Sequence, residues 1–427
     1  MISTLYLCYF GLREPLVQTQ VLPYLRELAA GGVGVSLLTF EPELKRRWTR
    51  AQIEQERARL AGAGISWHSL PYHKRPTFPA TVFDILAGAL KAARIARRDH
   101  VQVLHARSHV PMAMALVARM LSRVRTVFDV RGLLAEEYED AGLWSGRSLS
   151  FRAVKALERM GLRRADRVVV LTRRMREWLD RSGLAEAARV EVIPCCVDFA
   201  RYEATAGEAR PKSIEAKSEH VEAKSKRFEV VYAGSVTGLY MLEEMARFFL
   251  AVRARRTDAF FRVLTTSDAE AASEVLRRAG LSDEEFAVGA VGAREVPRAL
   301  GRARLGVSFR RATFSQIAAS PTKIPEYLAA GLAVVSNAGI GDTDELIERE
   351  RVGVLVGEFT ESEYARAAEE ALRLCEEAAT PARCVETARK FFDLETIGGR
   401  RYLDVYKRLD EMINHRDTED TEEAQRI

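Results

Sequence analysis

The stretch SPTKIPEYLAAGLAVVS, from Ser320 to Ser336, carries the clearest structural information in this 427-residue chain. It follows an apolar run at residues 305–309, so Ser320 and Pro321 close a loop after a strand and begin a helix. Gly331 ends that helix, and the apolar residues after it return to a strand. The free N–H groups at the start of such a helix suit an anion such as a diphosphate.

Two charged side chains of this helix could contact that anion. Lys323 lies in the first turn, where a cation normally opposes the helix dipole, and a bound anion would remove this conflict. Glu326 comes three residues later on the same helix face, and its carboxylate can accept hydrogen bonds from two vicinal hydroxyls. An ordinary capped helix with a Lys–Glu surface pair would explain the same spacing.

Short apolar runs alternate with amphipathic stretches through both halves of the chain, which indicates parallel sheets covered by helices. The strands predicted in the first half are residues 5–10, 35–40, 101–105, 125–130, 167–172 and 190–194. Those in the second half are residues 228–234, 260–265, 286–291, 305–309, 333–336 and 353–356. The predicted fold class is therefore α/β, with two Rossmann-like doubly wound domains facing a central cleft.

Composition suggests the domain boundaries. We expect an N-terminal domain over residues 1–200 and a second domain over residues 228–392. Residues 201–227 contain almost no large apolar side chains, which predicts a polar linker or insertion. Residues 393–413 should form a C-terminal helix that returns to the N-terminal domain, followed by a disordered tail over residues 414–427.

Bulk properties argue against several classes of protein. The 65 Lys and Arg nearly balance the 60 Asp and Glu, which disfavours a nucleic-acid binder. The five cysteines contain no C-x-x-C pair, so neither a zinc ribbon nor a disulfide framework is indicated. No apolar run is long enough to span a membrane, and the N-terminus is typical of a first strand. We expect a cytoplasmic protein.

Residues 320–336 resemble the signature SPxKxxEYxAxGxPVV of the group-1 (family 4) retaining glycosyltransferases, which have the GT-B fold. The resemblance implies a nucleotide diphosphate sugar as co-substrate, retention of anomeric configuration, and no metal or other cofactor. It places Lys323 and Glu326 in the catalytic and donor-binding site together with Ser320. Glu326 matches the second glutamate of the family's E-x7-E element, but Ala318 stands where the first would be. Ser315, Gln316 and backbone amides near Ala319 are then candidates for holding the sugar hydroxyls.

A second donor-side element is the strand and turn that contain Gly234 and Ser235. Glycine lets a backbone approach a phosphate, and the position resembles the first loop of the family's C-terminal domain. The loop lacks the basic residue usual there, so Arg310 or Arg311 could supply that charge. A plain βα turn and a solvated arginine pair are the alternatives.

The acceptor side should lie in the first half. Gly11, Arg13 and Gln18 follow the first strand and could form a lip over the cleft, or a simple loop. By the resemblance, His109 or Arg107 would lie near the reacting sugar. Asp129 and Arg131 would be close by, although a lone histidine is often only structural.

The function we expect is transfer of a hexose to a glycan or lipid-linked acceptor, in cell-surface polysaccharide synthesis. The basic stretches at residues 91–98, 119–125 and 147–167 could contact an anionic membrane at its inner face, or be ordinary solvated helices. A nucleotide-sugar epimerase or sugar phosphorylase of the same fold is one alternative. A non-catalytic nucleotide-sugar-binding subunit is another.

Overall fold

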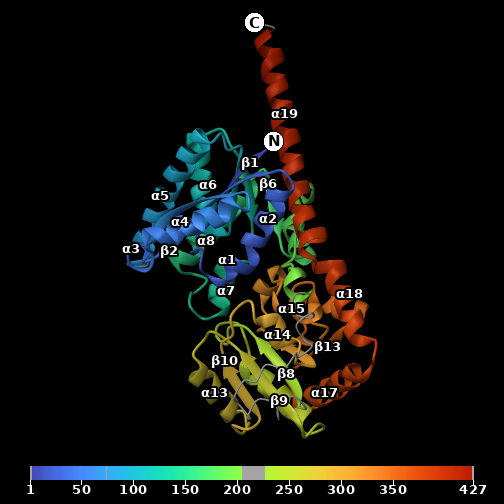
Figure 1. The fold of residues 1–427 in the computed structure, drawn as a ribbon. Helices are drawn as coiled ribbons and strands as arrows, with labels where there is room; N and C mark the ends of the chain where they lie inside the picture. Colours follow the sequence, from blue (N-terminus) through green and yellow to red (C-terminus); the bar gives the residue numbers. More distant parts are fainter. Residues whose placement is uncertain (1, 74, 204–226, 426–427) are drawn as a thin grey trace. The chain divides into compact units, whose positions relative to one another are not determined.

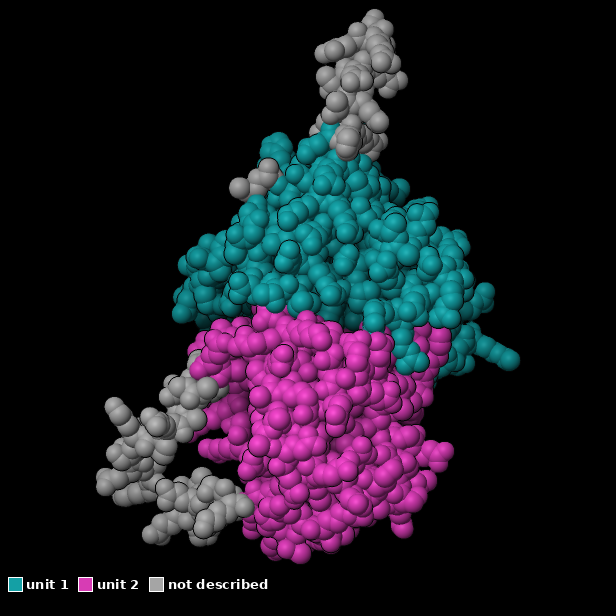
Figure 2. Space-filling model, turned by 90° about the vertical axis from the view of Figure 1, so that its right-hand side faces the viewer, with its two compact units in different colours: residues 1–194, 395–427 teal, residues 195–394 magenta. Residues whose placement is uncertain are grey.

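The computed structural model describes residues 2–73, 75–203 and 227–425. Most of the predicted linker at residues 201–227 lies outside these residues. The chain divides into two compact units, called unit 1 (Met1–Pro194 with Glu395–Ile427) and unit 2 (Cys195–Leu394) (Figures 1 and 2). Within the described residues, no helix combines the length and apolarity needed to cross a bilayer.

Unit 1 is built on a parallel sheet whose described strands have the order β3-β2-β1-β4-β5-β6-β7. Their bounds are β1 Ser3–Cys8, β2 Gly34–Pro42, β3 Ile65–Tyr72, β4 Val103–Arg107, β5 Arg125–Asp129, β6 Arg167–Val170 and β7 Val190–Val192. The chain moves outward from β1 to β3 and then returns to pair β4 with β1. This reversal creates a switch point, where loops after β1 and β4 diverge and ligands commonly bind.

The helices of unit 1 follow from the same alternation. They are α1 Pro15–Gln20, α2 Leu22–Ala30, α3 Leu44–Arg47, α4 Arg50–Ala61, α5 Thr77–Arg98, α6 His109–Leu121, α7 Leu134–Asp140, α8 Leu149–Arg164, α9 Arg173–Arg181 and α19 Arg400–Gln425. Two elements were not predicted from the sequence. Strand β3 is an edge strand with a mixed burial pattern. Helix α4 is polar and begins with a capping box between Thr49 and Gln52.

Unit 2 repeats the topology, with described strands in the order β10-β9-β8-β11-β12-β13. Its strands are β8 Phe228–Ala233, β9 Ala259–Leu264, β10 Phe286–Gly289, β11 Leu305–Ser308, β12 Ala333–Asn337 and β13 Gly353–Val356. Its helices are α12 Leu242–Arg253, α13 Ala269–Arg278, α14 Val296–Leu300, α15 Lys323–Ala329, α16 Thr343–Glu350, α17 Glu361–Glu376 and α18 Thr380–Phe392. The prediction of two Rossmann-like α/β domains is confirmed.

Tyr327 fixes α15 on the sheet of unit 2. Its buried hydroxyl accepts a hydrogen bond from Ala233 N at 2.8 Å and donates to Val307 O at 3.3 Å. A Cβ atom at Gly306 would lie 2.4 Å from the Tyr327 ring, so only glycine allows this approach. The helix that contains Lys323 is therefore held against the carboxyl ends of β8 and β11.

The C-terminal helix belongs to unit 1, as predicted (Figure 1). The Tyr406 hydroxyl contacts His105 Nδ1 at 2.8 Å and donates to Thr4 Oγ1 at 2.9 Å. The predicted end at residue 413 is wrong, because α19 continues to Gln425 through the expected disordered tail. This polar segment contains no glycine or proline, and polar composition alone does not end a helix.

The first domain boundary also falls earlier than residue 200. Residues from Cys195 onward belong to unit 2, where Val197, Phe199 and Tyr202 pack into the apolar cluster beside α15. Val197 also pairs with Asp393 through an isolated bridge. These apolar side chains bind the segment to unit 2, which composition alone did not reveal.

Candidate functional site

The candidate site of unit 2 lies at the carboxyl ends of β8 and β11, the switch point of its sheet. Gly234 and Ser235 follow β8, Arg310 follows β11, and Lys323 is the first residue of α15. The structure thus brings together three segments that the sequence analysis assigned to donor binding.

Lys323 lies directly against the backbone of Gly234. A Cβ atom at residue 234 would be 2.4 Å from Lys323 Cε and 2.6 Å from Nζ, and the φ of Gly234 is +144°. Both the close approach and this backbone conformation require glycine. The glycine of this loop therefore makes room for the lysine.

Aromatic rings surround the Lys323 ammonium. Nζ lies 3.9 Å from the ring centroid of Tyr240 and 5.3 Å from that of Tyr232, and only 4% of the residue is exposed. Burial lowers the pKa of Lys323, while Tyr240 opposes this shift. Among the described residues no carboxylate forms an ion pair with it, so an anionic ligand would supply the missing countercharge.

Arg310 adds a second cation beside the same ring. Its guanidinium carbon is 4.9 Å from the Tyr240 centroid, and Nη1 donates to the Tyr240 hydroxyl at 3.5 Å. Its backbone N donates to Asn337 Oδ1 at 2.8 Å, while its buried Nε has no hydrogen-bond partner among the described atoms. Arg311 is exposed and donates its backbone N–H to Leu239 O. Of the two arginines, Arg310 is the one beside Lys323.

The loop after β8 is held by its own side chains. Tyr232 donates its hydroxyl hydrogen to Ser235 O, and Ser235 Oγ accepts from Thr237 N at 3.3 Å. Ser235 is exposed, so its hydroxyl hydrogen can still reach a ligand. The Ser320 hydroxyl instead accepts from Cys195 N at 3.1 Å and ties the loop before α15 to residue 195.

Glu326 faces an arginine that the sequence analysis did not consider. Arg201 Nη1 lies 3.8 Å from Glu326 Oε1, and the glutamate side chain is 19% exposed. Burial raises the pKa of Glu326, while Arg201 and Lys323 oppose this rise. No sequence motif connects residues 201 and 326, and only the packing of residues 195–203 onto unit 2 brings them together.

Residues 314–318 form the 3₁₀ turn that ends at the position of the absent first glutamate. Ala318 is fully buried. The Gln316 side chain is also fully buried; its Nε2 donates to Ser315 Oγ at 2.8 Å. Gln316 Oε1 has no hydrogen-bond partner among the described atoms. A buried amide oxygen without a partner is costly, so it suits a ligand hydroxyl.

In unit 1, Asp129 is the centre of a buried polar cluster at the carboxyl ends of β4 and β5. Its carboxylate accepts hydrogen bonds from Tyr402 at 3.1 Å and Tyr6 at 3.4 Å. Arg107 Nη1 and Arg131 Nη1 lie 3.5 Å and 3.4 Å from it. Burial alone would raise the pKa of Asp129, but Arg131, His105 and Arg107 outweigh burial and lower it.

The structure places His109 inside the fold. It begins α6, is fully buried, and its Nε2 lies 3.0 Å from Glu158 Oε2. Burial would raise the pKa of Glu158, but the hydrogen bond from His109 and the charge of Lys155 lower it. The imidazole is therefore enclosed. Ser108, the residue before it, has a φ of +70°, which is a strained backbone conformation for a residue other than glycine.

The predicted lip after β1 is an internally bonded loop. A Cβ atom at Gly11 would lie 2.8 Å from Pro42 Cδ. Gln18 Nε2 donates to Leu12 O at 2.6 Å, and the Arg13 guanidinium lies 3.8 Å above the Trp48 ring centroid. These contacts fix the shape of the loop. A role for Arg13 and Gln18 in acceptor binding stays a prediction.

Comparison with known proteins places the two units in one family. Residues 17–196 match the Glycosyl transferase 4-like domain, and residues 227–373 match the Glycosyl transferases group 1 model. No curated protein sequence matches the chain.

Solved structures with the same fold share little sequence with this chain. Sucrose-phosphate synthase from Thermosynechococcus elongatus superposes with a TM-score of 0.68 at 14% identity, over 96% of this chain and 100% of that one. Anabaena HepE in complex with UDP and glucose gives 0.66 at 13%, over 95% and 100%. A putative UDP-N-acetylglucosamine 2-epimerase from Listeria monocytogenes gives 0.57 at 12%, over 95% and 96%.

Two Rossmann-like units, with a buried lysine at the switch point of the second, define a protein of the GT-B class. The two domain matches identify the chain more closely: it belongs to the group-1 glycosyltransferases.

Proposed function

We propose that this glycosyltransferase moves a hexose from a nucleotide diphosphate sugar to a glycan or lipid-linked acceptor, with retention of configuration, in cell-surface polysaccharide synthesis. The observation that carries the donor assignment is Lys323, a buried ammonium at the switch point of unit 2 with no carboxylate partner among the described residues. A diphosphate supplies the opposite charge that this position lacks.

Lys323 and Arg310 would stabilise the leaving group. The bond between the anomeric carbon and the diphosphate oxygen breaks, and its electron pair leaves with that oxygen. An acceptor hydroxyl oxygen forms the new bond to the anomeric carbon, and the hydroxyl proton leaves with the diphosphate. Two cations fixed beside Tyr240 meet this developing charge without rearrangement, which is the most effective form of electrostatic catalysis. Because side chains provide this charge, we propose that the reaction needs no metal and no other cofactor.

Gln316 would bind the sugar in place of the absent glutamate. Its unpartnered Oε1 can accept a hydrogen bond from one hexose hydroxyl. Glu326, whose charge is partly compensated by Arg201, can accept from hydroxyls of the ribose or the sugar. Gln316 would thus take the role of the family's first glutamate, while Glu326 is the second glutamate itself.

Unit 1 would provide the acceptor side, at the edge that contains Gly11, Arg107 and Arg131. A lipid-linked acceptor stays in a membrane, so we also propose that the protein acts at the inner face of the cell membrane as a peripheral protein.

Thermal shift with a panel of nucleotide sugars tests the donor assignment, because a ligand that binds only the folded state raises its Tm. Transfer to a membrane extract is then measured with the best donor. We expect a donor-dependent product for the wild-type chain and for Lys390→Ala, which changes an exposed lysine of unit 2. Lys323→Ala should lose activity by about two orders of magnitude or more.

The two alternatives give different outcomes. An epimerase or phosphorylase would convert the nucleotide sugar without an acceptor, and the structure of a putative UDP-N-acetylglucosamine 2-epimerase from Listeria monocytogenes has the same fold. A non-catalytic subunit would bind the donor and convert nothing, as the alanine at residue 318 could suggest. Either result would reject transfer as the function.

A further inference from the structure

Helix α5 exposes a stripe of large apolar side chains. Phe78, Val82, Leu86 and Leu90 follow each other at four-residue intervals, which keeps them on one side of a helix. Their exposed fractions are 69%, 40%, 51% and 49%, and Phe83 beside them is 58% exposed. A soluble surface helix normally directs such residues inward.

The buried face of α5 does not need these side chains. It consists mainly of small residues, and at Gly88 a Cβ atom would lie 2.6 Å from Met114 Sδ of α6. The helix therefore packs on α6 and the sheet through its small residues and leaves its large ones in solvent. This inverted arrangement indicates a second partner for the outer face.

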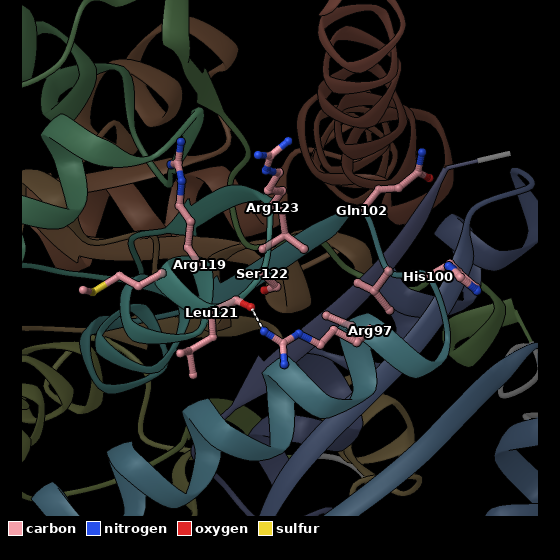
Figure 3. A pocket seen from close by; sticks show the side chains of 11 residues that line it. Arg97, His100, Gln102, Arg119, Leu121, Ser122 and Arg123 are labelled. Carbon is pink, nitrogen blue, oxygen red and sulfur yellow. Dashed lines mark hydrogen bonds between the residues drawn. The ribbon is translucent and has the colours of Figure 1, made fainter. Parts of the chain in front are cut away.

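Basic side chains extend the same surface toward the end of α5. Arg94, Arg97 and Arg98 are exposed on the last turns. Beyond them lies a pocket of 630 Å³ between the ends of α5 and α6, lined by Arg97, His100, Arg119 and Arg123 among others (Figure 3). In it Arg97 reaches across to donate to Leu121 O.

Three of these guanidinium groups, those of Arg94, Arg97 and Arg123, have no ion pair within the described part of the chain. Arg98 is paired with Asp99, and Arg119 with Asp166 at 3.1 Å. Met120, at the pocket, is 84% exposed. Unpaired cations next to exposed apolar side chains suit a bilayer surface. The cations can contact the lipid phosphates, and the apolar side chains can contact the acyl chains beneath them.

We propose that α5 and the end of α6 form the surface through which this protein binds an anionic phospholipid bilayer, with α5 lying in the interface. This inference rests on the proposed function, because the lipid of a lipid-linked acceptor would lie in the membrane that this surface binds. Phe78 begins the stripe six residues after β3 ends, so the start of the stripe lies at the same sheet edge as Arg107 and Asp129. The acceptor would thus arrive at the ligand-binding edge of unit 1.

A second copy of the chain fits this surface less well. The one acidic residue within α5 is Asp84, which is fully buried and bonded to His73 and Tyr9. A two-fold interface through α5 would therefore place arginines near arginines without exposed carboxylates of this helix to pair them. An anionic membrane provides the complementary charge.

Vesicle sedimentation with the full chain tests the proposal. We expect binding to vesicles of equal parts phosphatidylcholine and phosphatidylglycerol, and much weaker binding to phosphatidylcholine alone. The triple variant Phe78→Gln, Leu86→Gln, Leu90→Gln keeps good helix formers and should weaken binding at least about tenfold. Arg94→Gln with Arg123→Gln should weaken it by about tenfold as well.

Matched controls decide where the surface lies. Arg278→Gln with Arg298→Gln removes two exposed charges from unit 2, and Leu149→Gln removes an exposed apolar side chain from α8. Both should bind vesicles like the wild type. An equal loss in either control, or a wild-type dimer that the α5 variant converts to monomer, would overturn the assignment.

The donor-induced rise in Tm, measured on the same samples, separates this inference from the proposed function. It should be the same in all variants, which also shows that they are folded. If the donor raises the Tm of the wild type but the protein does not bind vesicles, only the membrane surface is rejected. If the protein binds vesicles through α5 but no donor raises its Tm, only the donor assignment is rejected.

Discussion

Lys323 reaches the backbone of Gly234 so closely that a methyl group at residue 234 would overlap its Cε. The loop after β8 and the start of α15 are therefore coupled, because the Lys323 side chain occupies the space that a side chain at residue 234 would need. The Tyr240 ring also contacts the ammonium, and the Arg310 guanidinium lies against the same ring.

Gly234→Ala should displace the Lys323 side chain and abolish the donor-induced rise in Tm. The control is Gly238→Ala in the same loop, where φ is +74° but no atom lies within 4 Å of the added Cβ. That change should cost only the backbone strain, about 1–3 kcal/mol, and keep donor binding. Equal donor affinity in both variants would show that the glycine does not position the lysine.

The pH dependence of donor binding should report on Lys323. Burial lowers its pKa, so its charge is lost at a lower pH than that of an exposed lysine. Below this pKa the ammonium attracts the diphosphate, and affinity should fall as the pH rises through it. Binding should also take up protons near this pKa, because the bound anion favours the charged form. Calorimetry in buffers of different ionisation enthalpy measures that uptake, and Lys323→Ala should lack it.

Gln316→Ala should weaken binding of the nucleotide sugar and leave binding of the free nucleoside diphosphate unchanged. The reason is that its unpartnered Oε1 would contact the sugar alone. We expect about a fivefold to tenfold loss, the usual size for one neutral hydrogen bond. Ser235→Ala is the useful comparison, since a loss there should be the same for both ligands. An equal loss of both ligands in Gln316→Ala would place Gln316 outside the sugar site.

Asp129→Asn should destabilise the protein strongly. The carboxylate pairs with Arg107 and Arg131, and removing one partner of a buried ion pair costs about 3–5 kcal/mol. Because the folded-state pKa of Asp129 is lowered, its contribution is present above the unfolded pKa and is lost as the pH falls through the folded one. Urea unfolding at neutral and acidic pH measures this difference, and Asp404→Asn on the exposed side of α19 should have little effect.

The apolar periodicity was sufficient to predict the two sheets, because buried parallel strands are nearly continuous apolar runs. Strand β3 was missed since it is an edge strand whose side chains are only partly buried. The C-terminal helix extends past its predicted end because a helix can continue through polar residues once its first turns are anchored.

The site was predictable to the extent that it depends on position in the chain. Lys323 could be found from its place at a helix start, but its burial and its contact with Tyr240 required the fold. His109 follows a strand in sequence, yet Glu158, 49 residues later, encloses it. Arg201 gave no signal because it lies at the edge of a polar segment, and only its packing in unit 2 brings it to Glu326.

Calorimetric titration of the wild type and Lys323→Ala with the best nucleotide sugar measures whether Lys323 binds the donor. We expect a loss of about hundredfold in donor affinity for Lys323→Ala, because a buried charge-assisted contact with the diphosphate is removed. Lys390→Ala, measured alongside, should bind like the wild type. Equal affinity of Lys323→Ala and the wild type would contradict the assignment of this site to the donor.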